Sequence, residues 1–205
     1  MSARRKMPML ILASASPRRA ELLRHLGLRF RIVPSHADET ADAHLSPREL
    51  CRLNAYRKAR VVAERHPDAL VLGADTLVFL GRRIFGKPSS LREAEQMLLA
   101  LEGRTHHVVT GVALLEWRAR RERVFAVTTA VRFRRLTRAQ VRRYLGAVNP
   151  LDKAGAYAIQ EHGEWLVEEV VGSFTNVVGL PLERVEAELR GWFAPGRAAR
   201  PTRAG

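Results

Sequence analysis

Residues 14–19, Ser-Ala-Ser-Pro-Arg-Arg, bring two hydroxyls and two guanidiniums to a predicted helix start. Ser16 is a favourable N-cap, and Pro17 follows at the first helical position, where its missing N–H costs nothing. The start of a helix presents free N–H groups and the positive end of the dipole, so it suits an anion. An ordinary capped helix with two solvated arginines would have the same sequence. The candidate phosphate-binding side chains are Ser14, Ser16, Arg18 and Arg19.

Asp75 is the strongest candidate for a catalytic residue. It follows the apolar run 69–74, which predicts a buried strand, and we expect the aspartate to end that strand. A carboxylate there is costly to desolvate unless it meets a cation, a metal or hydrogen-bond donors. The ends of strands in α/β sheets are also common ligand sites. The alternative is a turn aspartate that bonds only to its own backbone.

Other charged side chains extend this site towards phosphate chemistry. Glu39, in the polar loop 34–40, would join Asp75 in offering oxygen ligands to Mg²⁺ or Mn²⁺. Only four of the 35 basic residues are lysines, and a compact ammonium is not replaceable by a guanidinium where a point charge is needed. Three of these lysines lie at predicted junctions or loops, and we interpret them as functional rather than as chance survivors of an arginine-rich composition: Lys58, Lys87 and Lys153. Together these groups suit a reaction in which cations stabilise phosphate charge and a carboxylate activates water.

The elements that must position these residues predict one α/β domain with a mixed sheet. Helices are expected to start at residues 17, 47, 91, 138 and 182, and capping boxes open those at 47 and 91. Strands are expected near residues 10–12, 30–33, 69–74, 76–79, 83–85 and 165–171. The β-rich segments 107–117 and 123–134 predict an antiparallel hairpin. We expect a flexible basic segment at 1–8, one domain over 9–193 and a disordered basic tail at 194–205.

Composition narrows the function further. The chain has 205 residues, a net charge of +14 and a single cysteine, which fits a reducing compartment such as the cytoplasm. No apolar run is long enough to span a membrane. P-loop, paired Cys/His zinc and GxSxG patterns do not occur. The run 132–143 holds six arginines and no acid, so a nucleic-acid-binding module that does not hydrolyse nucleotides stays open as an alternative, although nucleic acid is not the partner we favour.

Seven blocks occur in the order expected of one known family: SASPRR, ADET, YRKA, GADT, GKP, DKAGAYAIQ and SFTNVVGLPL. The chain resembles Maf proteins over about residues 9–192. The resemblance implies a metal-dependent nucleoside triphosphate pyrophosphatase that clears nucleotide pools, with a possible link to septum formation. It also implies an ITPase-like fold, with an elongated mixed sheet flanked by helices and two lobes around a cleft. A cytoplasmic homodimer without a membrane partner is the expected assembly.

The resemblance also implies roles for individual residues. Asp75 matches the proton acceptor, and further residues match positions that line the phosphate and metal site: Ser14, Arg19, Glu39, Lys58, Lys87 and Lys153. Three positions associated with base choice match the branch that acts on dTTP and UTP: Arg18, Thr76 and Gln160. The amide of Gln160 offers a donor and an acceptor to the carbonyl–NH–carbonyl edge of uracil or thymine. Modified pyrimidine nucleotides stay open as further substrates.

Asn149 departs from the family pattern. Many relatives have Glu at this position before the proline, and if that Glu helps to hold the metal, its absence would weaken metal binding here. Asp152, three residues later, is a candidate to compensate.

Overall fold

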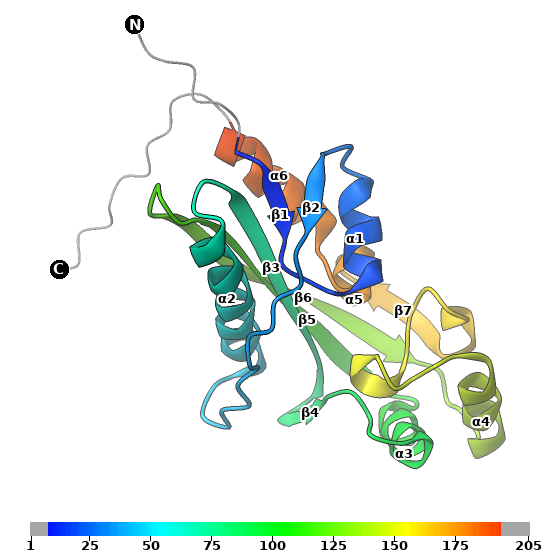
Figure 1. Cartoon of the computed structure of the whole chain (residues 1–205). Coiled ribbons are helices and arrows are strands. Elements are labelled where there is room, and N and C mark those ends of the chain that lie inside the picture. The colour runs from blue at the N-terminus through cyan, green and yellow to red at the C-terminus, as the bar shows by residue number, and fades with distance from the viewer. Residues whose placement is uncertain (1–7, 194–205) are drawn as a thin grey trace, which may run out of the picture.

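The computed structural model describes residues 8–193, which form one seven-stranded mixed sheet with helices on both faces (Figure 1). The strand order is β2-β1-β3-β5-β6-β7, and β4 pairs with the C-terminal end of β3. β2, β1 and β3 are parallel, while β3 to β7 pair antiparallel. The bounds are β1 Leu10–Leu12, β2 Phe30–Ile32, β3 Leu70–Leu80, β4 Arg83–Phe85, β5 Thr105–Glu116, β6 Arg121–Phe133 and β7 Val167–Val171.

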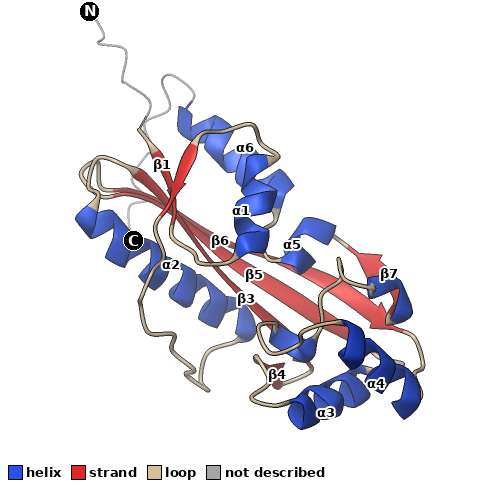
Figure 2. Cartoon of the chain, turned by 45° about the vertical axis from the view of Figure 1, so that its right-hand side comes forward, coloured by secondary structure: helices blue, strands red, loops and turns tan. Residues whose placement is uncertain are grey.

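Side-chain alternation along the strands gives the sheet a hydrophobic core on each face. Leu12 and Leu72 face α1 and α6, whereas Ile11 and Val71 face α2, since successive strand residues point to opposite faces. Figure 2 shows α1 and α6 together on the opposite side of the sheet from α2. The helices are α1 Pro17–Arg24, α2 Pro47–Arg65, α3 Leu91–Leu101, α4 Arg138–Ala147, α5 Phe174–Val178 and α6 Leu182–Phe193.

A separate hydrophobic cluster forms at the other end of the long strands. There α3 and α4 pack through Leu98 and Tyr144 against Val131 and Phe133 of β6. The cluster also holds Tyr157, from the loop after α4. The molecule therefore has two lobes that share the central strands β3, β5 and β6, and segments from both lobes line the cleft described below.

Several expected elements are confirmed. β5 and β6 form the antiparallel hairpin, and the capping box of α2 is present, with Ser46 accepting from Glu49 N while Glu49 accepts from Ser46 N. Segments 1–7 and 194–205, for which we predicted flexibility, lie outside the described residues. Among the residues that are described, no helix is long and apolar enough to cross a membrane.

The expected end of a strand at Asp75 is wrong. β3 runs without interruption from Leu70 to Leu80, and Asp75 lies in its middle, opposite Gly111 of β5. The strand continues through the aspartate because the carboxylate finds partners on α2, so it does not need a turn or solvent. The local sequence around Asp75 does not show that Lys58 of a distant helix will pack against its carboxylate.

Candidate active site

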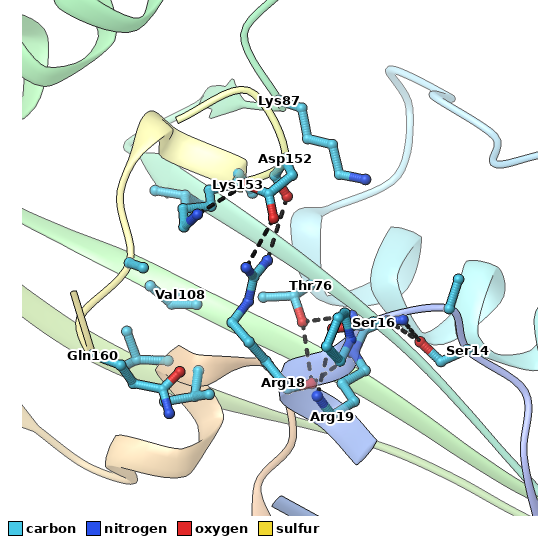
Figure 3. Close-up of a pocket in the computed structure, with 18 of the residues that line it drawn as sticks. Ser14, Ser16, Arg18, Arg19, Thr76, Lys87, Val108, Asp152, Lys153 and Gln160 are labelled. Atoms are coloured by element: carbon cyan, nitrogen blue, oxygen red, sulfur yellow. Dashed lines mark hydrogen bonds and ion pairs between the residues drawn. The ribbon is translucent and has the colours of Figure 1, made fainter. Parts of the chain in front are cut away.

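The cleft forms where β1 stops and β3 continues. β1 pairs with β3 only as far as Leu12 opposite Leu72, and β4 begins to pair with the same strand at Val78. A cleft of about 440 Å³ opens over this interval. It is lined by the start of α1, the loop that holds Glu39, and residues 152–160 (Figure 3). One break in strand pairing thus brings together motifs that lie far apart in the sequence.

Two glycines let α2 lie directly on the sheet beside Asp75. A Cβ atom on Gly73 would overlap the backbone oxygen of Ala55, and one on Gly111 would overlap that of Cys51. Both strands therefore need glycine where the helix crosses them. The close approach brings the polar side chains of α2 within hydrogen-bond distance of the carboxylate of Asp75.

Lys58 joins the two candidate acids. Its Nζ donates at 2.6 Å to Oδ1 of Asp75 and at 2.6 Å to Oε1 of Glu39. Asp75 is only 4% exposed and does not itself line the cleft, whereas Lys58 and Glu39 do. Burial raises the pKa of Glu39, but the hydrogen bond and charge of Lys58 outweigh it and leave that pKa below its ordinary value. The lowered pKa keeps Glu39 a carboxylate, and the side chains of Glu39 and Asp75 face the same ammonium.

Asn54 is a site residue that our sequence analysis missed. Its Nδ2 donates to Asp75 Oδ2 at 3.4 Å, while its Oδ1 accepts from Thr40 N at 2.9 Å. It therefore ties the loop of Glu39 to the carboxylate of Asp75. Asn54 precedes Lys58 by four residues, so the two share one face of α2, and that spacing was the available signal.

The guanidinium of Arg19 is held by three hydrogen bonds. Its Nε donates to Gly179 O at 2.9 Å, one terminal nitrogen donates to Ser14 Oγ at 3.3 Å, and the other donates to Thr76 Oγ1 at 3.0 Å. Burial lowers the pKa of Arg19, and the negative charge of Asp75 opposes that shift. Ser16 caps α1 by accepting from Arg19 N, as the sequence predicts. The guanidinium is thus fixed at the start of α1.

Arg18 takes a different direction and reaches across the cleft to Asp152 (Figure 3). It donates to Asp152 Oδ2 at 2.9 Å, and Lys153 donates to Oδ1 at 2.8 Å. Burial raises the pKa of Asp152, but these two hydrogen bonds prevail and the net shift is downward. Lys153 is 5% exposed and also donates to the backbone oxygen of Asn149. Asp152 is thus engaged by two cations and fixes the wall formed by residues 149–153.

The remaining predicted residues also line the cleft. Lys87, on the loop after β4, and Gln160 are both exposed. Gly155 N donates to Gly86 O at 3.0 Å, which joins the loop of Lys87 to the wall that carries Lys153. Every predicted site residue except Asp75 lines this one cleft, and Asp75 lies directly behind Lys58.

The charge of the lining favours a polyanion. Five cations line the cleft against two carboxylates, those of Glu39 and Asp152. The cations are Arg18, Arg19, Lys58, Lys87 and Lys153. Among the described residues, no group of three or more His, Cys, Asp or Glu side chains is arranged to hold a metal ion. The carboxylates of Glu39 and Asp75 nevertheless converge on one cation, the ammonium of Lys58. Mg²⁺ and Mn²⁺ bind to such carboxylate oxygens, and phosphate oxygens can complete their coordination shell.

Fold and site define an open mixed-sheet α/β protein with a cationic cleft. The fold is similar to that of a HAM1 protein from Coxiella burnetii, with a TM-score of 0.51, 16% identity, and coverage of 90% of this chain and 100% of that one. The model of the family described as Maf-like protein matches residues 9–192, and the chain belongs to this family.

Similar proteins include one from Moorella thermoacetica, 52% identical over 88% of this chain and 93% of its own length. One from Akkermansia muciniphila is 47% identical over 90% of this chain and 97% of its own length. One from Myxococcus xanthus is 49% identical over 93% of this chain and 97% of its own length. All three carry the name dTTP/UTP pyrophosphatase.

Proposed function

We propose that this protein hydrolyses dTTP and UTP to the nucleoside monophosphate and pyrophosphate. The observation that carries the proposal is a cleft lined by five cations, with the carboxylate of Asp75 held behind one of them. Such a cleft complements a triphosphate, and a carboxylate beside it is suited to activate water. The names of the relatives, which match over most of their length, support the same substrates.

In the proposed reaction Arg19, Lys58, Lys87 and Lys153 hold the phosphates, with Ser14 and Ser16 at the start of α1. Water attacks the α-phosphorus, and Asp75 accepts the proton of that water. The bond between the α-phosphorus and the bridging oxygen to the β-phosphate breaks, and pyrophosphate leaves with the electron pair. Because Lys58 now bonds to Asp75, we expect the incoming phosphates to draw the ammonium towards the cleft and uncover the carboxylate.

Glu39 and Asp75 would hold a divalent cation, Mg²⁺ or Mn²⁺. Their two carboxylates are now neutralised by the ammonium of Lys58. When bound, such an ion would neutralise phosphate charge and polarise the reacting oxygens. We assign base choice to Arg18, Thr76 and Gln160, all of which line the cleft. The amide of Gln160 is exposed to an incoming base, so it can bond to part of the edge that uracil and thymine share.

One assay tests the proposal. Pyrophosphate release is measured with purified protein from dTTP, UTP, CTP, ATP and GTP, with Mg²⁺, with Mn²⁺ and with a chelator. We expect turnover of dTTP and UTP that depends on the metal. Release of inorganic phosphate instead of pyrophosphate, or a preference for purines, would contradict the proposal.

We further propose that the protein acts in the cytoplasm as a homodimer, the assembly that the sequence resemblance implies. Analytical ultracentrifugation at micromolar concentration tests the assembly, and a single species of 23.1 kDa would contradict it.

A further inference from the structure

We infer that Thr110, a buried threonine outside the cleft, is a positioning residue that orients the guanidinium of Arg19 towards the substrate. The inference rests on the proposed function, because Arg19 is there assigned to phosphate binding. Thr110 lies on β5, is fully buried and does not line the cleft. Its position directly opposite Thr76 of β3 places it behind the wall of the site.

A continuous line of hydrogen bonds connects Arg19 to Thr110. Arg19 donates to Thr76 Oγ1 at 3.0 Å, and the hydroxyls of Thr76 and Thr110 are 2.9 Å apart. Thr110 Oγ1 then donates to the backbone oxygen of Asn176 in α5 at 3.1 Å. Arg19 is also bonded to Gly179 O, just past the end of the same helix. The arginine is thus tied to α5 twice, once directly and once through two threonines.

The number of hydroxyl protons sets the direction of this line. Each threonine has one proton to donate. With the proton of Thr110 on Asn176 O, the proton of Thr76 goes to Thr110 at 2.9 Å, because its other acceptor, Gly179 O, is 3.5 Å away and too distant for a strong bond. The lone pairs of Thr76 are then left to face Arg19. Thr76 consequently has no proton for the base, and we expect it to influence substrate choice through Arg19.

Thr129 provides a matched control. It lies on β6, is fully buried, and donates from Oγ1 to Ser173 O at 3.0 Å, so it fastens α5 to the sheet as Thr110 does. It accepts from Asn176 Nδ2 but makes no bond to Thr76 or Arg19. If Thr110 only stabilised α5, replacing either threonine by valine would have the same effect on the site.

The test compares Thr110→Val, Thr110→Ser and Thr129→Val with wild type. Calorimetric titration with dTTP in the presence of a chelator measures binding without turnover, and thermal denaturation establishes that each variant is folded. We expect Thr110→Val to weaken dTTP binding about tenfold, which corresponds to the loss of one hydrogen bond from the charged guanidinium of Arg19 to the phosphates, and Thr110→Ser to restore it. Thr129→Val should bind within about twofold of wild type, because it lies outside the line to Arg19.

A double-mutant cycle separates orientation of Arg19 from general stabilisation. In an Arg19→Ala background, or Arg19→Lys if that variant does not fold, Thr110→Val should have no further effect on dTTP binding, because the group it orients is gone. Equal losses in Thr110→Val and Thr129→Val, or an undiminished loss in the Arg19 background, would overturn the inference.

Failure of the proposed function gives a different result. A wild-type protein that binds dTTP without releasing pyrophosphate contradicts the hydrolysis and leaves the Thr110 comparison to be decided by binding. A wild type that does not bind dTTP overturns both.

Discussion

At the scale of single residues, the central arrangement is one lysine shared by two acids. Lys58 bonds at equal length to the buried Asp75 and to the exposed Glu39, so neither acid faces the cleft without a counter-charge. A buried carboxylate is stabilised only while it keeps such a partner, and the phosphates of a substrate would compete for the same ammonium. Under the proposed function, the arrival of substrate would thereby be coupled to exposure of the candidate base.

We predict that Asp75→Asn folds but loses activity by about 10²- to 10⁴-fold in kcat, because an amide cannot accept the proton of water. Pyrophosphate release from dTTP measures the loss, and circular dichroism establishes the fold. Asp68→Asn, which removes a surface carboxylate paired with Arg118, is the control and should keep wild-type kcat. Near-normal kcat in Asp75→Asn would remove Asp75 from the catalytic role.

Gln160→Glu should lower kcat/KM for UTP and dTTP by about tenfold or more, because a carboxylate has no donor for the base edge of a pyrimidine and repels its carbonyls. Stability should change little, since the side chain is exposed. The matched control is Gln96→Glu, an exposed glutamine on α3 outside the cleft. Unchanged UTP turnover in Gln160→Glu would contradict the assignment of base choice to this residue.

At the scale of elements, the site depends on how closely α2 approaches β3 and β5. Ser46 and Glu49 start the helix, but the position of Lys58 relative to Asp75 is set by the two glycines beneath the helix. The helix carries both partners of the aspartate, Asn54 and Lys58, so a small displacement of the whole element would separate the carboxylate from both.

We therefore predict that Gly111→Ala destabilises the protein by about 1–3 kcal/mol, because the added Cβ overlaps the backbone of α2 at Cys51. Activity should fall in the fraction that stays folded, since the helix must move away from Asp75. Gly146→Ala is the control: nothing lies within 4 Å of a Cβ there, and its place in α4 predicts equal or higher stability. Thermal denaturation and dTTP turnover of both variants test the difference, and equal melting temperatures would contradict it.

At the scale of the whole molecule, the lobe that holds α3 and α4 contains a histidine that makes the free energy of unfolding depend on pH. His106 is fully buried, and its Nε2 lies 2.8 Å from the hydroxyl of Tyr157, which lines the cleft. Burial, with a smaller contribution from the charge of His107, lowers the pKa of His106 to about 4. Because the unfolded chain binds this proton near pH 6.5 and the folded chain does not, acid favours unfolding.

The expected loss of stability from this one histidine is about 3 kcal/mol between pH 7 and pH 4, with most of the slope below pH 6.5 and a plateau below pH 4. Urea denaturation of wild type and His106→Gln across this range measures it. The slope should be smaller in the variant, and His44→Gln, in an exposed loop, should behave as wild type. Parallel curves for wild type and His106→Gln would contradict the assignment.

Four of the six arginines of the basic run 132–143 are held by neighbouring side chains, although the two carboxylates involved leave the run positively charged. Of the six arginines between 132 and 143, Arg138 and Arg142 pair with Glu95, Arg132 pairs with Glu168, and Arg143 stacks on Trp165. We therefore expect any binding to DNA to be generic electrostatic attraction that disappears by about 200 mM salt. Fluorescence anisotropy with a labelled duplex measures it, and binding that survives that salt would favour the nucleic-acid alternative.

Local sequence patterns predicted most of the elements and, together with the family resemblance, most of the residues that line the cleft. Short-range propensities and the alternation of apolar residues determine three of these features: the cap of α1 at Ser16, the capping box of α2 and the β5–β6 hairpin. Such patterns can be recognised in the sequence without knowledge of the tertiary structure. The departures in composition were equally informative, since the three lysines singled out in an arginine-rich chain all line or border the same cleft.

Only the tertiary structure decided how these residues are related, because their partners lie on elements distant in the chain. Asp75 sits inside a strand and not at its end, since Lys58 of α2 neutralises it, and the packing of the same helix brings Asn54 to the carboxylate. Arg18 and Arg19 are adjacent in sequence, yet one reaches Asp152 across the cleft while the other is bonded to Thr76. The sequence by itself predicted most of the side chains that line the cleft; the pairing of strands and the approach of a helix decided which of them touch and brought Asn54 to the site.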